Sequence, residues 1–420
     1  MAIVLPFRGV RPPKSLVKQI AAPPYDVVSS REAREIAWGR EKNYLHVSRP
    51  EIDLPDGIDE HEDKVYDQGR ISYRKFRDNG WLVQDAKPCF YIYKQVMPLA
   101  GAGRKKTHSQ TGLVAAASAL DYDRDVIKKH EHTRPDKEDD RTRHISEINA
   151  NTEPVFFTYP HQAAVDKMVK AWCRKRPEYK FKSDDGVEHA LWVVDDDRVI
   201  SRIAGLFAKL KRLYVADGHH RSAAAWRLWK ERKSKNPRHN GREEYNFFLT
   251  VIFPDNQMNI MAYNRAVRDL NGLGPEEFLR SLSSKFLVSP NGPDRPGGAR
   301  KFSMYLKGRW YLLKARPGSF DAGDPVKRLD ASILQDNLFR PVLGIENPRT
   351  DKRLGFVGGI KGTRELKRLV DSGEYAAAFS LHPVTIRQLI SVADSGRVMP
   401  PKSTWFEPKL KSGLFVHEYD

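Results

Sequence analysis

The sequence predicts an α+β fold, in which strands and helices follow one another without the regular alternation of a βαβ protein. The chain has 420 residues, of which 40% are hydrophobic and 10% aromatic, and this is enough to bury a sizeable core in two or three domains. Short apolar stretches with strand character alternate irregularly with stretches of helical spacing. No internal repeat is visible, so a solenoid or propeller is not expected.

The chain is expected to divide into three regions. Residues 1–58 are punctuated by prolines, and residues 289–300, with the sequence SPNGPDRPGGAR, form the best candidate linker because glycine and proline interrupt regular structure. We therefore expect an N-terminal α+β region over 1–115, a core over 116–288 and a C-terminal α+β region over 301–420.

Before the core region, two helices and one strand are predicted. SSREAREIAW has serine caps ahead of acidic residues and predicts a short helix, and DEHEDKVYDQGRISYRKFRDNGW predicts a longer one closed by Asn79 and Gly80. CFYIYKQV alternates and is aromatic, which is typical of a strand. LAGAGRKKTHSQTG is expected to be a loop, and LVAAASALDYD a buried element.

The remaining elements follow from the same patterns. Strands are expected at PVFFTY, HALWVVDD, RLYVAD and YNFFLTVIFPD, and helices at AAVDKMVKAWCRKR and at about 220–233. Beyond residue 300, KFSMYLKGRWYLLKA predicts two strands around a Lys-Gly turn, and LGFVGGIKGTRE a glycine-rich hairpin.

The charge balance is basic. Lys and Arg number 72 against 54 Asp and Glu, so the formal net charge is +18, which favours polyanions or phosphorylated ligands as partners. A basic surface that serves no ligand explains the charge equally well. The two cysteines, Cys89 and Cys173, form no CxxC pair, so a disulfide scaffold and a cysteine zinc site are not expected.

The most informative stretch is YVADGHHRSAAAW, residues 214–226. An apolar strand end leads through Asp217 and Gly218 into an alanine-rich helix, so Gly218, His219, His220 and Arg221 lie at a helix N-terminus. Free backbone N–H groups and the helix dipole attract anions at that position, and an arginine fork matches a phosphate. Asp217 would repel a phosphate unless it caps the helix or holds a divalent cation.

A metal centre is the alternative interpretation of the two histidines. It needs further ligands, and KHEHT at 129–133 could supply them. His130 and His132 are two positions apart, so they share a face on a strand but not on a helix, and the segment does not have the HExxH spacing. An ordinary capped turn remains a third interpretation.

Glu131 lies in a stretch too polar for a core element, KKHEHTRPDKEDDRTRH. A carboxylate among cations is a candidate general base for a hydroxyl nucleophile. A solvated charged loop or helix with internal ion pairs explains the same composition. In MPPKSTWFEPKLKSG, Lys402, Ser403 and Thr404 lie between prolines, where they could close over a phosphate; a C-terminal strand fixed by its aromatic residues explains the segment equally well.

Known phosphate motifs are missing. GAGRKKTH lacks the GxxxxGK[ST] order of a P-loop, and there is no kinase H-R-D or D-F-G set. No start segment resembles a secretory signal and no apolar run approaches the ~20 residues of a membrane-spanning helix, so a cytoplasmic protein without a membrane partner is expected.

Several motifs together resemble domain-of-unknown-function family 1015 (DUF1015). They occur in the family order over nearly the whole chain: APPYDVVSSREA, NYLHVSRPEIDLP, TGLVAAASALDYDRDVIKKHEHT, DKEDDR, VADGHHR, LQDNLFRPVLGI and MPPKSTWFEPKLKSGL. Members of the family are regarded as relatives of free-serine kinases, with a mixed-sheet nucleotide core similar to the ParB/sulfiredoxin fold. The resemblance thus implies a ParB/sulfiredoxin-like catalytic core over 116–288, with the C-terminal region closing on it.

The resemblance also implies a reaction, the transfer of the ATP γ-phosphate to the hydroxyl of free L-serine to give O-phospho-L-serine, with Mg²⁺ as the metal. Glu131 would be the catalytic base, with His130 and Thr133 beside it, and Asp217 would help to place Mg²⁺. The nucleotide would be bound by the following residues: Gly218, His219, His220, Arg221, Lys402, Ser403 and Thr404.

Two positions depart from the family pattern. Ser222 and Ala223 follow the turn where members often carry a larger aromatic residue and an acid, and Asn264 stands before Arg265 where a histidine is common. Either difference could alter the acceptor pocket. The alternative function is a ParB-like nucleotide-sensing or nucleic-acid-binding protein, motivated by the basic charge, although no helix-turn-helix or aromatic-basic RNA signature supports nucleic acid as a partner.

Overall fold

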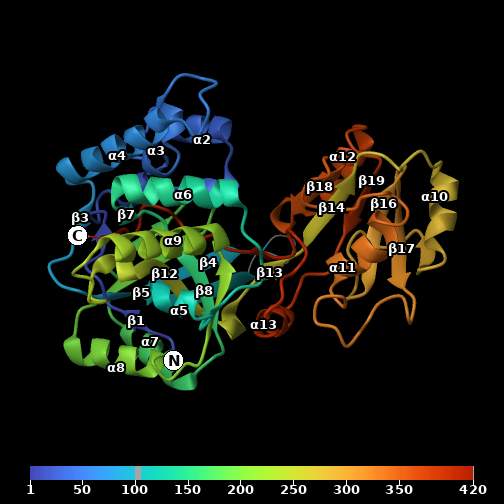
Figure 1. The fold of residues 1–420 in the computed structure, drawn as a ribbon. Helices are drawn as coiled ribbons and strands as arrows, with labels where there is room; N and C mark the ends of the chain where they lie inside the picture. The colour runs from blue at the N-terminus through green and yellow to red at the C-terminus, as the bar shows by residue number, and fades with distance from the viewer. Residues whose placement is uncertain (100–105, 420) are drawn as a thin grey trace. The chain divides into compact units, whose positions relative to one another are not determined.

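The computed structural model describes residues 1–99 and 106–419. It divides into two compact units, which can be followed by colour in Figure 1. The first unit comprises 1–129, 133–258 and 408–420, and the second comprises 130–132 and 259–407. The second unit is therefore an insertion in the first, because the chain returns to the first unit at Pro408.

The first unit contains nine α-helices in the described part of the chain. They are α1 (Val17–Ile20), α2 (Ser30–Ala37), α3 (Leu45–Ser48), α4 (Asp63–Asp78), α5 (Ala119–Asp123), α6 (Pro135–Ile148), α7 (Ala163–Trp172), α8 (Asp197–Phe207) and α9 (His219–Lys235). Its strands are β1 (Val4–Leu5), β2 (Val10–Arg11), β3 (Val83–Gln84), β4 (Phe90–Pro98), β5 (Thr107–Ser118), β6 (Ile127–Lys128), β7 (Ala150–Asn151), β8 (Val155–Tyr159), β9 (Tyr179–Lys182), β10 (Glu188–Val194), β11 (Leu213–Asp217), β12 (Phe247–Pro254) and β21 (His417–Glu418).

A large mixed sheet forms the centre of the first unit. Its strand order is β6-β11-β8-β12-β5-β4-β10-β9, and β1 pairs with β5 outside this path. The pairs β6–β11 and β8–β12 are parallel, and the other pairs are antiparallel. The α+β class with a mixed sheet is thus confirmed.

The two faces of this sheet have different coverings, because side chains alternate along each strand. Leu113 and Phe157 face a hydrophobic core that also contains residues of α7, α8 and α9. On β4 and β5, Gln95 and Gln110 are paired in register, and their amide groups donate to the backbone carbonyls of Lys409 and Pro408. The C-terminal segment from Pro408 is thereby attached to the sheet.

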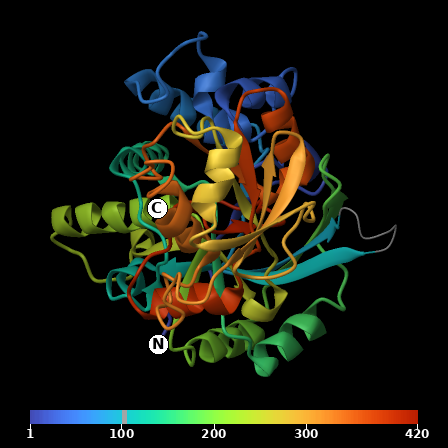
Figure 2. The ribbon, with the colours of Figure 1, turned by 90° about the vertical axis from the view of Figure 1, so that its right-hand side faces the viewer.

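The second unit has a smaller sheet that is antiparallel throughout, seen from another side in Figure 2. Its strand order is β15-β17-β16-β19-β14-β18. The unit consists of β13 (Ile260–Met261), β14 (Tyr263–Val267), α10 (Pro275–Leu282), β15 (Phe286–Pro290), β16 (Lys301–Leu306), β17 (Arg309–Ala315), α11 (Asp330–Leu334), β18 (Leu354–Gly358), α12 (Gly362–Asp371), β19 (Ala377–Ser380), α13 (Ile386–Asp394) and β20 (Trp405–Phe406).

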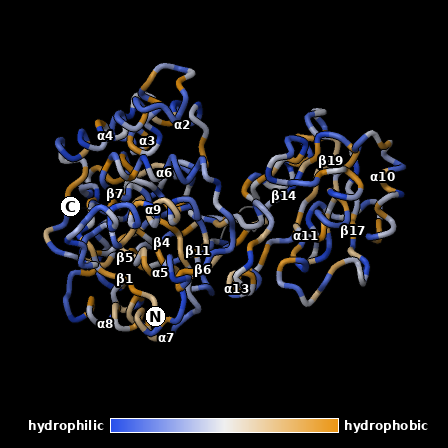
Figure 3. Tube along the Cα trace, viewed as in Figure 1, coloured by the Kyte–Doolittle hydropathy of each residue, from blue (hydrophilic) through white to orange (hydrophobic). Residues whose placement is uncertain are grey.

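Each unit buries its own hydrophobic core, and apolar stretches of chain run along the central strands (Figure 3). Phe302, Met304 and Phe379 are fully buried in the second unit, and Phe157, Val215 and Phe248 in the first. Separate cores of this kind are what define independent compact units.

Most of the expected elements are confirmed. They include the two N-terminal helices, which are α2 and α4, and the aromatic strand, which is β4. The polar stretch after Glu131 forms a helix, α6, but this helix is not solvated throughout, because Asp140, Arg141 and His144 are buried. The helix expected at about 220–233 is α9.

Three local expectations were wrong. Residues 107–112 belong to the long strand β5 and not to a loop, because β4 pairs with them up to Thr107; residues 100–105 of that expected loop lie outside the described residues. The expected linker 289–300 joins two strands of one sheet, and the glycine-rich hairpin is β18 followed by helix α12. The contact-defined division differs from the expected three regions, since β5 runs across residue 115.

Among the described residues, we find no helix with the length and apolar character that crossing a membrane requires.

Candidate functional site

Helix α9 begins at the turn that the sequence singled out. Gly218 precedes the helix with φ of +90°, a left-handed conformation that residues with a side chain rarely adopt. As a glycine, Gly218 has no side chain that could cap the first turn of α9. The first backbone N–H groups of a helix have no partner inside the helix, so this turn presents donors and the positive end of the dipole.

Asp217 closes strand β11 and is held from two sides. Its Oδ1 accepts a hydrogen bond from the Gly218 N–H at 2.9 Å, and its Oδ2 lies 2.7 Å from the Lys409 ammonium. Burial alone would raise the pKa of Asp217, but the charges of Lys409 and Arg221 outweigh it and hold that pKa well below the usual range. Asp217 is therefore an ionised, paired carboxylate, and a cation at this position would compete with Lys409.

The Arg221 guanidinium folds back beneath the turn. It lies 3.1 Å from the place where a Cβ on Gly218 would be, and its Nη1 donates to the carbonyl of Pro154. Nη2 lies 3.5 Å from Asp26, and Nε has no hydrogen-bond partner among the described residues. Burial opposes the charge, but Asp26, Glu153 and Asp217 keep the pKa of Arg221 above its ordinary value. Arg221 thus contributes a fixed positive charge under the helix start, and not an extended fork.

A second buried carboxyl group, that of Glu153, interacts with the charge of Arg221. Glu153 accepts hydrogen bonds from the Tyr25 N–H at 3.1 Å and from the Ser412 hydroxyl. The pKa of Glu153 lies above its ordinary value, because the effect of burial outweighs the lowering effects of Arg221 and Ser412. These contacts connect the N-terminal segment, β8 and the C-terminal segment around Arg221.

Parallel strands explain why the two motifs of the sequence meet. β6 and β11 pair in parallel, with Tyr214 opposite Lys128. Parallel strands end at the same edge of a sheet, so the residues after Lys128 and the residues after Tyr214 leave at the same place. Glu131 follows Lys128 by three positions, as Asp217 follows Tyr214.

The far end of the KHEHT segment is fixed as well. The backbone N–H of Arg134 donates to Nε2 of His220 at 3.1 Å, and this ties the start of α6 to the start of α9. His220 Nε2 is therefore an acceptor and cannot donate to a phosphate through that nitrogen. Thr133 donates to Glu138 in the first turns of α6, so its hydroxyl serves the helix start.

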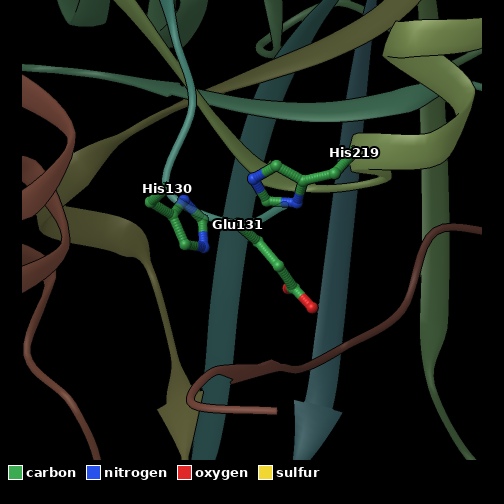
Figure 4. Close-up of side chains that lie close together, drawn as sticks. All are labelled: His130, Glu131 and His219. Atoms are coloured by element: carbon green, nitrogen blue, oxygen red, sulfur yellow. The ribbon is translucent and has the colours of Figure 1, made fainter. Parts of the chain in front are cut away.

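Two histidines and a carboxylate come close together at this edge (Figure 4). His130, Glu131 and His219 each offer one ligand atom, and these atoms all lie within 4.8 Å of one another. Imidazole nitrogens with a carboxylate oxygen suit a divalent transition metal such as zinc. The ligands that sequence spacing did not supply for a metal centre are brought together by the strand pairing.

The remaining predicted phosphate residues lie in the second unit. Lys402 has φ of +54°, and the Ser403 hydroxyl donates to the Pro400 carbonyl at 2.7 Å. The loop is held by Arg265, which donates to the carbonyls of Lys402 at 2.9 Å and Pro401 at 3.0 Å. Binding of phosphate by Lys402, Ser403 and Thr404 remains a prediction.

Sequence reasoning missed three side chains around Asp217 and Arg221. These residues are Asp26, Glu153 and Ser412. Two of them carried a signal, since Asp26 lies in APPYD and Ser412 in MPPKSTWFEPKLKSGL, segments already singled out. Nothing in the sequence pairs these segments with residue 217, because the contacts are made across the fold.

Comparisons with known proteins bear on this arrangement. A family model described as "Protein of unknown function (DUF1015)" matches residues 4–332. The chain belongs to this family, as its motifs indicated. The match includes the Asp217–Arg221 turn and Glu131 but ends before Lys402. No curated protein matches the chain.

Solved structures give weak matches. A conserved hypothetical protein from Pyrococcus furiosus is 14% identical with a TM-score of 0.34, over 74% of this chain and 97% of that one. A free serine kinase in complex with AMP is also 14% identical with a TM-score of 0.34, over 69% and 89%. C-terminally truncated SbnI from Staphylococcus aureus is 11% identical with a TM-score of 0.39, over 72% and 86%.

Proposed function

We propose that the chain is a small-molecule kinase, which transfers the γ-phosphate of ATP to the hydroxyl of free L-serine and releases O-phospho-L-serine. The acceptor comes from the motif resemblance of the sequence, and the core is proposed to be ParB/sulfiredoxin-like on the same ground. The observation that carries the proposal is the parallel pairing of β6 and β11, since it directs the segment with Glu131 to the same sheet edge as the start of α9.

In phosphoryl transfer a protein takes little part in bond formation. It mostly positions the reactants and neutralises the phosphate charge. In the proposed complex, the nucleotide phosphates lie at the start of α9, where Gly218 allows them to approach the backbone and His219 and His220 contribute N–H groups. The N–H of Gly218 itself donates to Asp217. Arg221 supplies a fixed positive charge beneath the phosphates, since its guanidinium is held against Gly218. Nucleotide binding by Lys402, Ser403 and Thr404 is proposed from the motif resemblance of the sequence alone.

Glu131 is proposed as the base that takes the proton from the serine hydroxyl as its oxygen attacks the γ-phosphorus. The bond between the γ-phosphorus and the β,γ-bridging oxygen breaks, and ADP leaves with the electron pair. His130 and Thr133 are proposed to support Glu131. The Asp217 carboxylate fits a cation by its charge, and Mg²⁺ bound there would neutralise phosphate oxygens once Lys409 gives way.

The direct test is incubation of the full chain with Mg²⁺-ATP and L-serine, with O-phospho-L-serine measured by mass spectrometry. Glu131→Gln is expected to lower turnover by about 100-fold or more, as loss of a general base does. Its binding of ATP should stay near that of the wild type. Glu147→Gln, on the exposed side of α6, is the matched control and should leave turnover unchanged.

No phosphoserine with ATP or with ADP would refute the proposal. Equal turnover in the Glu131→Gln variant would remove Glu131 as the base and leave the phosphoryl transfer standing. If zinc restores a chelated protein and Mg²⁺ does not, the group of His130, Glu131 and His219 would be a metal centre instead.

A further inference from the structure

A large cavity of the first unit lies away from the residues assigned above. It encloses about 1000 Å³, which is the upper end of the range for small-molecule sites. The N-terminal segment between Ser15 and Asn43 forms one wall, and the turn between β9 and β10 with Lys411 forms another. All of these residues belong to the first unit.

The floor of this cavity is a connected polar network. Lys411 Nζ donates to Asp185 at 2.7 Å, and Asp185 accepts from the hydroxyl of Ser183. The ring of His189 lies between Ser183 and Tyr93, with its nitrogens 2.8 Å and 2.7 Å from their hydroxyl oxygens. His189 is 1% exposed, and the side chain of Lys411 is 11% exposed. Buried polar networks of this kind rigidify a site when every member is satisfied.

The walls combine apolar surface with positive charge. Val28, Ile36 and Phe181 supply apolar surface, and one face of the Phe181 ring is stacked on His189 with centroids 4.9 Å apart. The four cationic residues that line the cavity outnumber the three acidic ones: Lys18, Arg40, Lys42 and Lys411 against Glu41, Asp184 and Asp185.

The acidic residues are already neutralised by their neighbours. Asp184 pairs with Arg40 at 3.2 Å and Asp185 with Lys411 at 2.7 Å, while Glu41 lies 3.9 Å from Lys42. Lys18 has no ion pair in the described part of the chain. A ligand here therefore meets a surplus positive charge beside a half-buried aromatic ring.

We infer that this cavity binds a small anion that carries a planar aromatic ring. Phe181, Val28 and Ile36 contact the ring, and Lys18 with Arg40 contacts the anionic group. This site is separate from phosphoryl transfer at α9 and stands whether or not serine is the acceptor.

The test uses 1-naphthyl phosphate, which has both features, in calorimetric titration of the full chain. Naphthol and inorganic phosphate supply the ring and the charge alone, and both are expected to bind at least about tenfold more weakly. Lys18→Glu should weaken binding of naphthyl phosphate about tenfold, because it replaces attraction with repulsion. Phe181→Leu should weaken binding of naphthyl phosphate and leave inorganic phosphate unchanged.

Lys14→Glu is the matched control, because Lys14 is exposed on the same segment and does not line the cavity. It should bind naphthyl phosphate as the wild type does. The inference is overturned if wild type fails to bind the probe at millimolar concentration, or if Lys18→Glu and Phe181→Leu both bind it unchanged. Loss of binding in Arg221→Lys alone would place the probe at α9 and also overturn it. None of these outcomes alters the phosphoserine assay.

Discussion

At the scale of single residues, Gly218 links the conformation of the backbone to the position of the Arg221 charge. Its left-handed conformation turns the chain from β11 into α9, and its missing side chain leaves room for the Arg221 guanidinium. The absence of a Cβ at Gly218 therefore permits both the turn and the buried position of the Arg221 guanidinium.

Gly218→Ala is expected to destabilise the first unit by about 1–3 kcal/mol, because a Cβ makes the positive φ costly and also displaces Arg221. The measurement is chemical unfolding of both proteins. Gly205→Ala is the control: Gly205 lies in α8 with open space around its Cα, so alanine should leave stability unchanged or raise it by about 1 kcal/mol. Equal effects of the two substitutions would contradict the argument.

His144 gives the molecule a pH dependence of known sign. Its Nε2 lies 2.9 Å from the Val47 carbonyl, and burial, reinforced by the charge of Arg141, lowers the pKa of His144 to about 4. In the unfolded chain the pKa returns to about 6.5, so between these values the unfolded state binds more protons. The contribution of His144 is therefore complete above about pH 6.5 and is lost as the pH falls toward about 4.

His144→Gln should flatten this dependence, because glutamine keeps an N–H donor for Val47 but does not titrate. The measurement is the free energy of unfolding at several values between pH 4 and pH 7. If wild type and variant lose stability in parallel over this range, His144 does not titrate as its surroundings require.

At the scale of elements, the loop from Pro400 to Thr404 is shaped by one arginine. Arg265 on β14 is 3% exposed, and it donates to the carbonyls of Tyr263, Pro401 and Lys402. The ring of Phe356 lies 4.8 Å from the guanidinium carbon. Burial lowers the pKa of Arg265, because desolvation disfavours the charged guanidinium.

Arg265→Lys is expected to cost about 2–4 kcal/mol, because an ammonium cannot reach three carbonyls that a planar fork spans. The loss should appear in the unfolding of the second unit and as faster hydrogen exchange at Ser403 and Thr404. Lys402→Gly separates conformation from charge, since glycine keeps the positive φ without the amine. Unchanged exchange in Arg265→Lys would show that the loop holds its shape without this residue.

The elements also show what a single sequence can predict. The helices from Ser30 and Asp63 and the aromatic strand β4 were found because capping residues and alternation are local signals. The glycine-rich segment before α12 and the linker were misjudged because glycine and proline also occur in tight connections within one sheet. The start of α9 was located from the sequence, but the pairing of β6 with β11 that directs Glu131 toward it is a long-range contact without a local pattern.

At the scale of the whole molecule, the first unit is made from distant parts of the chain. The segment from Pro408 contributes β21, which pairs with β7, together with the Lys409 and Ser412 contacts. Its Phe415 ring packs against Tyr91 of β4.

Removal of residues 408–420 is therefore expected to unfold or loosen the first unit while the second unit keeps its structure. Thermal unfolding of a chain ending at Glu407 should show loss of the first-unit transition, and hydrogen exchange should locate the loss at β7 and β11. Addition of a 408–420 peptide should restore protection in part. A truncated chain that unfolds as the wild type does would contradict this dependence.

The return of the chain at Pro408 also determines when the site can exist during synthesis. Domains fold as the ribosome releases them, and the second unit is complete once Glu407 has emerged. Asp217 has by then been synthesised for nearly two hundred codons, yet its Lys409 partner is translated only after the second unit. A prematurely terminated chain would thus carry a finished second unit and an unfinished charge arrangement at Asp217. The pairing of the Asp217 carboxylate therefore depends on a residue that is translated after the whole second unit.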